Sequence, residues 1–134
     1  MILTIEQDRA QHALTQIKNL INQPEAWQGR YKSYVKGLPA SILSNGLGQA
    51  LATLLSAAKG TTNDAHYVLY QHIEQWLCRS HPLAPYSGTS NVMDAITHHD
   101  STAYRLAQME AMAYLVWLKK FAAAYLLGEE GDVD

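Results

Sequence analysis

Apolar side chains recur at steps of three and four residues along most of this chain, which is the spacing of one face of an α-helix. The pattern is longest near the C-terminus, where a helix is predicted from Asp100 or Ser101 to about Leu127, with Gly128 ending it. Such a helix would be about 40 Å long at 1.5 Å per residue. Its continuous apolar seam consists of Tyr104, Ala107, Ala111, Tyr114, Leu118, Phe121 and Tyr125.

Two further helices have recognisable starts. The first is predicted over residues 4–22, because Thr4 and Gln7 have the spacing of a capping box, in which each side chain satisfies a backbone N–H at the start of a helix. Another begins at Asn63 or Asp64, both good N-cap residues. Its buried side is predicted to be Val68, Ile73, Trp76 and Leu77.

The segment between these two helices is predicted to form a second and a third helix. Pro24 suits the first turn of the second helix, where its missing N–H is not needed. We expect that helix to end at Gly37, because Leu38 precedes a proline and is steered away from helical geometry. Pro39 would then start a third helix that ends near Lys59.

A proline- and glycine-containing loop over 80–90 and a short helical turn over 91–98 complete the pattern. Strand signals are almost absent. The predicted fold class is therefore all-α, a compact bundle of five to six helices with a long C-terminal helix. We expect one helical domain over 1–128 and a flexible acidic tail over 129–134.

Gly46 and Gly48 fall inside the expected third helix, where each glycine costs roughly 0.5–1 kcal/mol relative to alanine. A cost of that size indicates that something packs closely against this face. Another helix is the favoured partner, and a nucleic-acid backbone is the alternative. A phosphate-binding loop is disfavoured, because no strand precedes the pair and a third glycine is missing.

The formal net charge of −2 conceals an uneven distribution of charge. Four of the twelve acidic residues lie in the tail, so 10 basic side chains face 8 acidic ones (12 minus 4) in the rest of the chain. No acid occurs from Ala26 to Asn63. That stretch contains the cations Arg30, Lys32, Lys36 and Lys59. The chain thus has one locally positive region. The distribution of charge along the chain is a better guide to its partners than the net charge.

The basic residues allow two interpretations. Lys32 and Lys36 are four residues apart and share a helix face, as a phosphate-binding surface requires. On composition alone, however, such charges are more often a solvated face. Lys119 and Lys120 lie near the end of the long helix, where they also compensate the helix dipole. Arg105 is expected to pair with Asp100, Asp94 or Glu110.

The sequence gives little support for a catalytic site or a metal site. The six histidines provide no pair with two ligands on one helix face, so no metal and no cofactor are predicted. Cys78 is the only cysteine, which excludes a disulfide within the chain and fits a reducing cytoplasm. No apolar run approaches the roughly 20 residues of a membrane span. We expect a soluble, cytoplasmic protein that is not an enzyme; a helical-bundle enzyme would require a bound metal or cofactor.

Two blocks of sequence resemble a known family. Residues 31–52 read Tyr-x-Ser-x-Val-Lys-Gly-Leu-Pro-x-x-Ile-x-x-Asn-Gly-Leu-Gly-Gln-Ala-Leu-Ala. A second block contains Tyr104-Arg105, Glu110-Ala111 and Trp117-Leu-Lys-Lys-Phe-Ala122. Together, in this order, they resemble the small subunit of the Cmr complex, the type III-B CRISPR effector. The resemblance covers most of the chain.

The resemblance implies an α-helical protein without a catalytic centre. Small subunits of this kind stack as a short filament along the effector and line the channel in which guide RNA pairs with target RNA, in antiviral defence. The implied partners are other Cmr subunits, further copies of the chain, and the two RNAs. Carried over to this chain, the RNA-binding residues would be Arg30, Lys32, Lys36, Asn45, Arg105, Lys119 and Lys120. The alternative is a structural spacer that contacts only protein.

Overall fold

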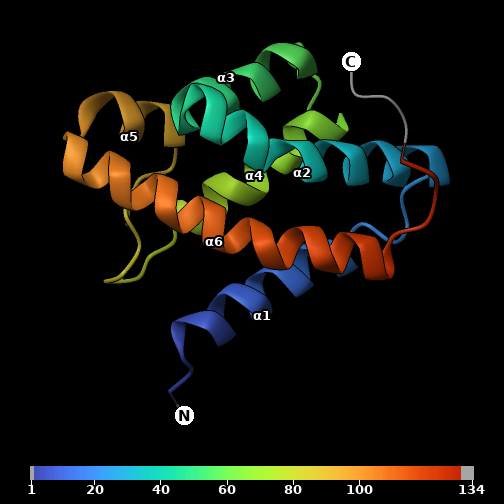
Figure 1. The fold of residues 1–134 in the computed structure, drawn as a ribbon, viewed down its shortest axis with the longest axis horizontal. Helices are drawn as coiled ribbons and strands as arrows, with labels where there is room; N and C mark the ends of the chain where they lie inside the picture. The colour runs from blue at the N-terminus through green and yellow to red at the C-terminus, as the bar shows by residue number, and fades with distance from the viewer. Residues whose placement is uncertain (1, 131–134) are drawn as a thin grey trace.

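The computed structural model describes residues 2–130 and contains six α-helices there (Figure 1). Their bounds are α1 Ile5–Lys18, α2 Glu25–Asn45, α3 Leu47–Ala58, α4 Ala65–Leu77, α5 Val92–His98 and α6 Ser101–Tyr125. No strand occurs among the described residues. The predicted all-α class and the long C-terminal helix are confirmed. Of the predicted acidic tail, Glu129 and Glu130 are described and 131–134 lie outside the described residues.

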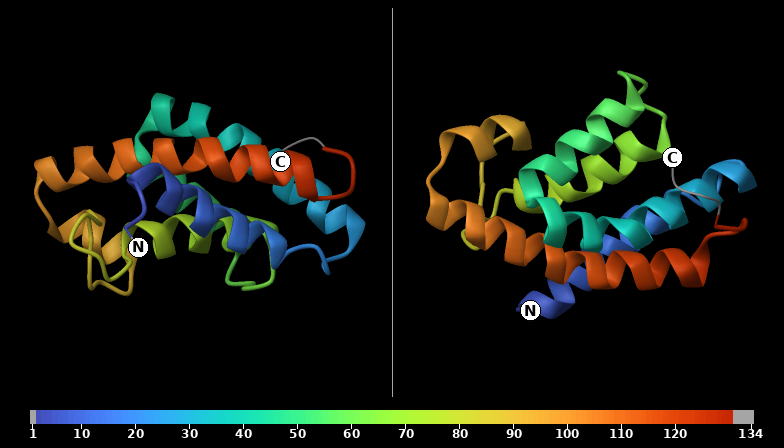
Figure 2. Two further views of the ribbon diagram at one scale, coloured as in Figure 1. Left: turned by 90° about the horizontal axis from the view of Figure 1, so that it is seen from below. Right: turned by 45° about the horizontal axis from the view of Figure 1, so that its top comes forward.

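The long helix α6 is the element on which the others pack. It contacts α1 most extensively and also packs on α2 and α4 (Figures 1 and 2). Its inward side chains Ala107, Ala111, Tyr114 and Leu118 are fully buried, as the seam predicted. Tyr125 at the end of the same seam is 47% exposed. A repeat of 3.5 residues drifts around a helix of 3.6 residues per turn, so the last seam position has rotated away from the core.

Local capping sets where most helices begin. Thr4 and Gln7 form the predicted capping box at the start of α1. Asp64 accepts the backbone N–H of His66 at the start of α4, and Asp100 caps α6. The predicted end of the first helix is wrong, because α1 stops at Lys18 and the chain continues in turns.

The predicted break between Gly37 and Pro39 is wrong. Helix α2 continues through Pro39 to Asn45, and the break falls at Gly46, whose φ of +86° is accessible to glycine and strained for other residues. Proline removes one backbone hydrogen bond, yet burial of Leu38 and Ile42 in the core holds the helix together on either side of it. As a result Lys32, Lys36 and Asn45 belong to one helix.

The close partner of the glycine pair is helix α6. The backbone N–H of Leu47 donates to Gln108 Oε1 at 2.9 Å, and that of Gly48 donates to the Tyr104 hydroxyl at 2.9 Å. A methyl group added at Gly46 would lie 2.9 Å from that same hydroxyl oxygen. The favoured interpretation, helix packing against the glycines, is confirmed.

None of the helices described between residues 2 and 130 is both long and apolar enough to cross a membrane.

Candidate nucleic-acid interface

Four lysines line one surface hollow between α2 and α6. The hollow measures about 280 Å³, and its lining residues are Lys32, Lys36, Lys119, Lys120, Ala122, Ala123 and Glu130. The two helices lie side by side (Figures 1 and 2). The spacing of Lys32 and Lys36 places them on one face, and the packing of α6 against that helix brings the other two lysines to them.

Most of this positive charge is open to solvent. Lys36, Lys119 and Lys120 are exposed, whereas Lys32 is half-buried with its Nζ 3.5 Å from the carbonyl oxygen of Leu126. Lysine ammonium groups are compact point charges that attract phosphate without reading sequence. Four of them around one hollow therefore form a surface suited to a polyanion.

One carboxylate enters the hollow. Lys36 Nζ donates to Glu130 Oε2 at 2.9 Å, and the two side chains are 66% and 39% exposed. An ion pair this open to water typically contributes between about 0.2 and 1 kcal/mol, because solvent and salt screen it. Glu130 thus offsets part of the charge without closing the hollow.

The other three predicted residues lie elsewhere. Arg30 lines a separate hollow with Glu25 and Glu129. Arg105 lines an apolar groove together with Leu43, Tyr104, Gln108, Met109 and Met112. Asn45 is exposed at the end of α2. The structure therefore brings four of the seven residues together and leaves three apart.

A partly buried charge network lies on the α1 side of α6, and sequence reasoning missed it. Arg9 donates to both carboxylate oxygens of Glu110, at 2.7 and 2.8 Å, and Trp76 Nε1 donates to Glu110 at 2.9 Å. Burial favours a higher pKa for Glu110, but the hydrogen bonds from Arg9 and Trp76 outweigh it and lower the pKa overall. Arg79 stacks on the Trp76 ring at 3.5 Å. Glu110, one of three partners considered for Arg105, is therefore paired with Arg9 instead.

Two inward-facing histidines are structural. His72 Nδ1 lies 2.6 Å from the Tyr31 hydroxyl, and His12 Nδ1 lies 2.6 Å from the Tyr114 hydroxyl. Burial lowers the pKa of His72 to about 3 and of His12 to about 4, so both are neutral at pH 7. Within residues 2–130, no three His, Cys, Asp or Glu side chains come together as metal ligands.

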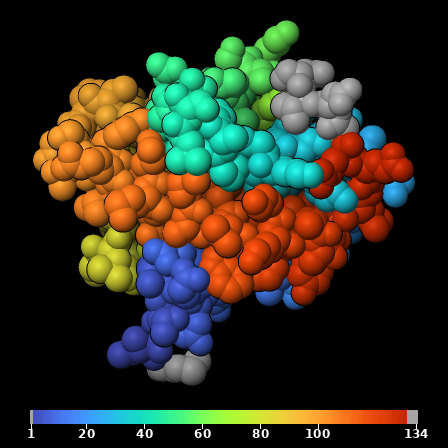
Figure 3. Space-filling model, in the orientation of Figure 1, coloured from blue at the N-terminus to red at the C-terminus, as the bar shows by residue number. Residues whose placement is uncertain are grey.

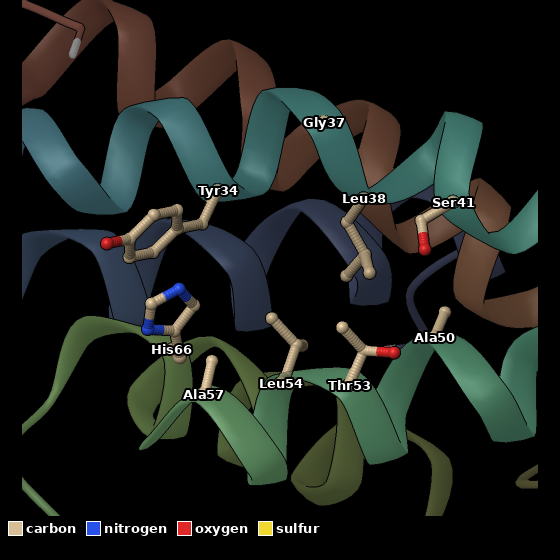
Figure 4. A pocket seen from close by; sticks show the side chains of 9 residues that line it. All are labelled: Tyr34, Gly37, Leu38, Ser41, Ala50, Thr53, Leu54, Ala57 and His66. Atoms are coloured by element: carbon tan, nitrogen blue, oxygen red, sulfur yellow. The ribbon is translucent and has the colours of Figure 1, made fainter. Parts of the chain in front are cut away.

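A separate apolar pocket of about 190 Å³ lies among α2, α3 and α4 (Figure 4). Tyr34 and His66 stack at one end with ring centroids 3.7 Å apart, and Leu38 and Leu54 form part of its wall. Lys36 lies two residues from both Tyr34 and Leu38, so it points from the opposite side of the helix. The pocket and the lysine hollow are therefore distinct sites.

Comparison with protein families gives a match over nearly the whole described chain. The matching family is the CRISPR-associated protein (Cas_Cmr5) family, over residues 5–125. The chain belongs to this family. It is a small subunit of the Cmr, or type III-B, CRISPR complex, as the two sequence blocks predicted.

The Cas_Cmr5 match covers all six helices and all four lysines of the hollow. Glu129 and Glu130 lie beyond it. Family membership implies association with other subunits of the Cmr complex, where the family's role is structural.

Proposed function

We propose that this subunit is non-catalytic, stacks with further copies of itself in the Cmr complex, and lines the channel that holds the guide and target RNA. The observation that carries the RNA part of this proposal is the hollow formed by Lys32, Lys36, Lys119 and Lys120. In an RNA-guided complex, base pairing supplies the sequence specificity, so a protein lining the channel needs only to attract the phosphate backbone. Lysines attract phosphate without reading the base sequence, and so fit that requirement.

Several copies of the subunit along one RNA can bind it together even if each lysine hollow binds weakly. One hollow with four partly screened lysines binds RNA weakly, and salt weakens it further. Several copies along one strand bind it together, because each bound copy raises the effective concentration of the RNA at the next. This arrangement accounts for a modest net charge in a protein that contacts RNA.

Exposed apolar residues at two places along α6 support stacking. Leu43 and Met109, both strongly exposed, line the apolar groove near the N-terminal half of α6. Tyr125 and Leu127 are exposed at its other end. Met109 and Tyr125 are separated by about 24 Å along the helix at 1.5 Å per residue. Contact between unlike patches of successive copies is heterologous, the type that builds open filaments.

Charge reversal in the hollow tests the RNA role. The variant K32E/K36E is incorporated into the reconstituted Cmr complex and compared with K59E, which reverses an exposed lysine at the end of α3. We expect target-RNA affinity to fall about tenfold or more for K32E/K36E and to change little for K59E, with normal assembly in both. Size-exclusion chromatography measures assembly, and fluorescence anisotropy with labelled target RNA measures binding.

A structural spacer is the second candidate, and the contact between Lys36 and Glu130 favours it, since that lysine already has a partner. Normal assembly with unchanged RNA binding by K32E/K36E would establish the spacer and exclude the channel role for these residues.

A further inference from the structure

The chain after α6 turns back across α2 at a site built for close backbone contact. A methyl group added at Gly29 would overlap the carbonyl oxygen of Glu129, and one added at Gly128 would overlap that of Glu25. Gly128 also has a φ of +85°, where other residues are strained. Two glycines therefore permit a crossing that any side chain at either position would obstruct.

Hydrogen bonds fix the chain at this crossing. The backbone N–H of Leu127 donates to Gln28 Oε1 at 2.7 Å. Gln28 is buried, and its Nε2 donates to the carbonyl oxygens of Gln23 at 2.7 Å and Ile21 at 3.2 Å. One buried amide thus ties the C-terminal segment to the turn before α2.

The crossing delivers acidic residues to the lysine hollow. Glu130 follows the crossing directly, lines the hollow and pairs with Lys36 at 2.9 Å. Asp132 and Asp134 follow in the sequence, so every charged residue after Gly128 is acidic. Among the described residues of this segment, Glu130 therefore has both the position and the charge sign to occupy the surface that we propose for RNA.

We infer that Glu130, held beside the hollow by the crossing, is an intramolecular competitor for the phosphate backbone. In the free subunit Glu130 occupies the hollow, and RNA displaces it when the hollow binds phosphate. This inference rests on the proposed function, since it assumes that the four lysines bind RNA.

The strength of the contact suits a displaceable competitor. An exposed ion pair contributes between about 0.2 and 1 kcal/mol, which corresponds to a change in RNA affinity of about 1.4- to 5-fold. Tethering keeps the carboxylate close to the hollow at a high effective concentration. A single phosphate and the Glu130 carboxylate are therefore comparable partners for Lys36. An RNA held along several copies binds more strongly and displaces the carboxylate.

The test measures binding of a fluorescein-labelled single-stranded oligouridine at low salt. It compares four full-length proteins, the charge-reversal variant K32E/K36E and a charge control. The proteins are wild type, E130Q, K36Q and K36Q/E130Q. The control is D94N, which removes one negative charge from an exposed position of α5. Helix α5 lies beside the N-terminal end of α6 (Figures 1 and 3), whereas Lys119 and Lys120 of the hollow belong to the C-terminal half of α6. We expect E130Q to tighten binding about two- to fivefold and D94N to have a smaller effect. In the K36Q background, E130Q should increase the affinity for the oligouridine by no more than D94N does in the wild type.

The outcomes separate this inference from the proposed function. Equal effects of E130Q and D94N, while K32E/K36E still weakens binding, would overturn the competitor and leave the RNA role intact. RNA binding that is unchanged in K32E/K36E would overturn both the competitor inference and the RNA role of the hollow. Every protein is also measured within the reconstituted Cmr complex, so that weak binding by the isolated subunit does not conceal the result.

Discussion

The hydroxyl of Tyr104 on α6 accepts the backbone N–H of Gly48 at 2.9 Å, so one helix caps the first turn of another. Helix α3 begins at Leu47, and its N-cap residue Gly46 has no side chain to cap it. Gln108, one turn further along α6, accepts the N–H of Leu47 in the same way. The junction between α2 and α3 is therefore held by α6 and not by residues of its own.

Removing this cap should destabilise the protein. We expect Y104F to lower the free energy of unfolding by about 1 kcal/mol, since an N-cap contributes about 0.5–2 kcal/mol. Y125F removes a hydroxyl from an exposed tyrosine and should change stability by less than about 0.5 kcal/mol. Urea denaturation followed by circular dichroism measures both. Equal effects of the two substitutions would contradict the capping role.

Two glycines of α2 should respond differently to substitution by alanine. A methyl group at Gly37 meets nothing within 4 Å, so G37A should stabilise the protein by roughly 0.5–1 kcal/mol through better helix propensity. At Gly29 the methyl group would overlap the backbone of Glu129, so G29A should bring no such gain. Thermal unfolding of the two variants compares them directly. A gain in G29A equal to that in G37A would show that the C-terminal crossing does not constrain α2.

Acid should destabilise the fold below about pH 6.5. The pKa values of His72 and His12 are lowered by burial to about 3 and about 4, whereas in the unfolded chain each lies near 6.5. Between these values the unfolded chain binds more protons, so stability falls as pH is lowered, by up to about 1.4 kcal/mol per pH unit for each histidine.

Urea midpoints at pH 7 and pH 5 test this dependence. The variant H72Q should lose about half of the wild-type difference between the two pH values. A wild-type midpoint that is the same at both pH values would contradict the assignment of both histidines as neutral in the folded protein at pH 7.

Local signals predicted the parts of the fold that depend on neighbouring residues. The capping box of Thr4 and Gln7 lies within one turn, and the seam of α6 is a repeat within a single helix. The α2–α3 junction was misplaced because its caps come from residues 56 and 61 positions away, which no local pattern reveals. Pro39 predicts a break by its local effect alone, whereas burial of Leu38 and Ile42 continues the helix past it.

The candidate site divides in the same way. The four-residue spacing of Lys32 and Lys36 predicted their common face, and the resemblance added Lys119 and Lys120. The four lysines lie around one hollow because of how α2 packs against α6, which is tertiary structure that local spacing does not determine. The Arg9–Glu110 pair spans 101 positions, so spacing offered no signal for it.

The salt dependence of target-RNA binding tests the central claim most directly. Complexes containing wild type, K32Q/K36Q/K119Q/K120Q or K59Q are compared between 50 and 200 mM salt, conditions over which phosphate contacts are strongly weakened. Each lysine–phosphate contact that is lost should make the slope of log affinity against log salt shallower by roughly 0.7–0.9. We predict a slope shallower by about one to three for the fourfold variant and little change for K59Q. Identical slopes for all three complexes would contradict RNA contact at the hollow.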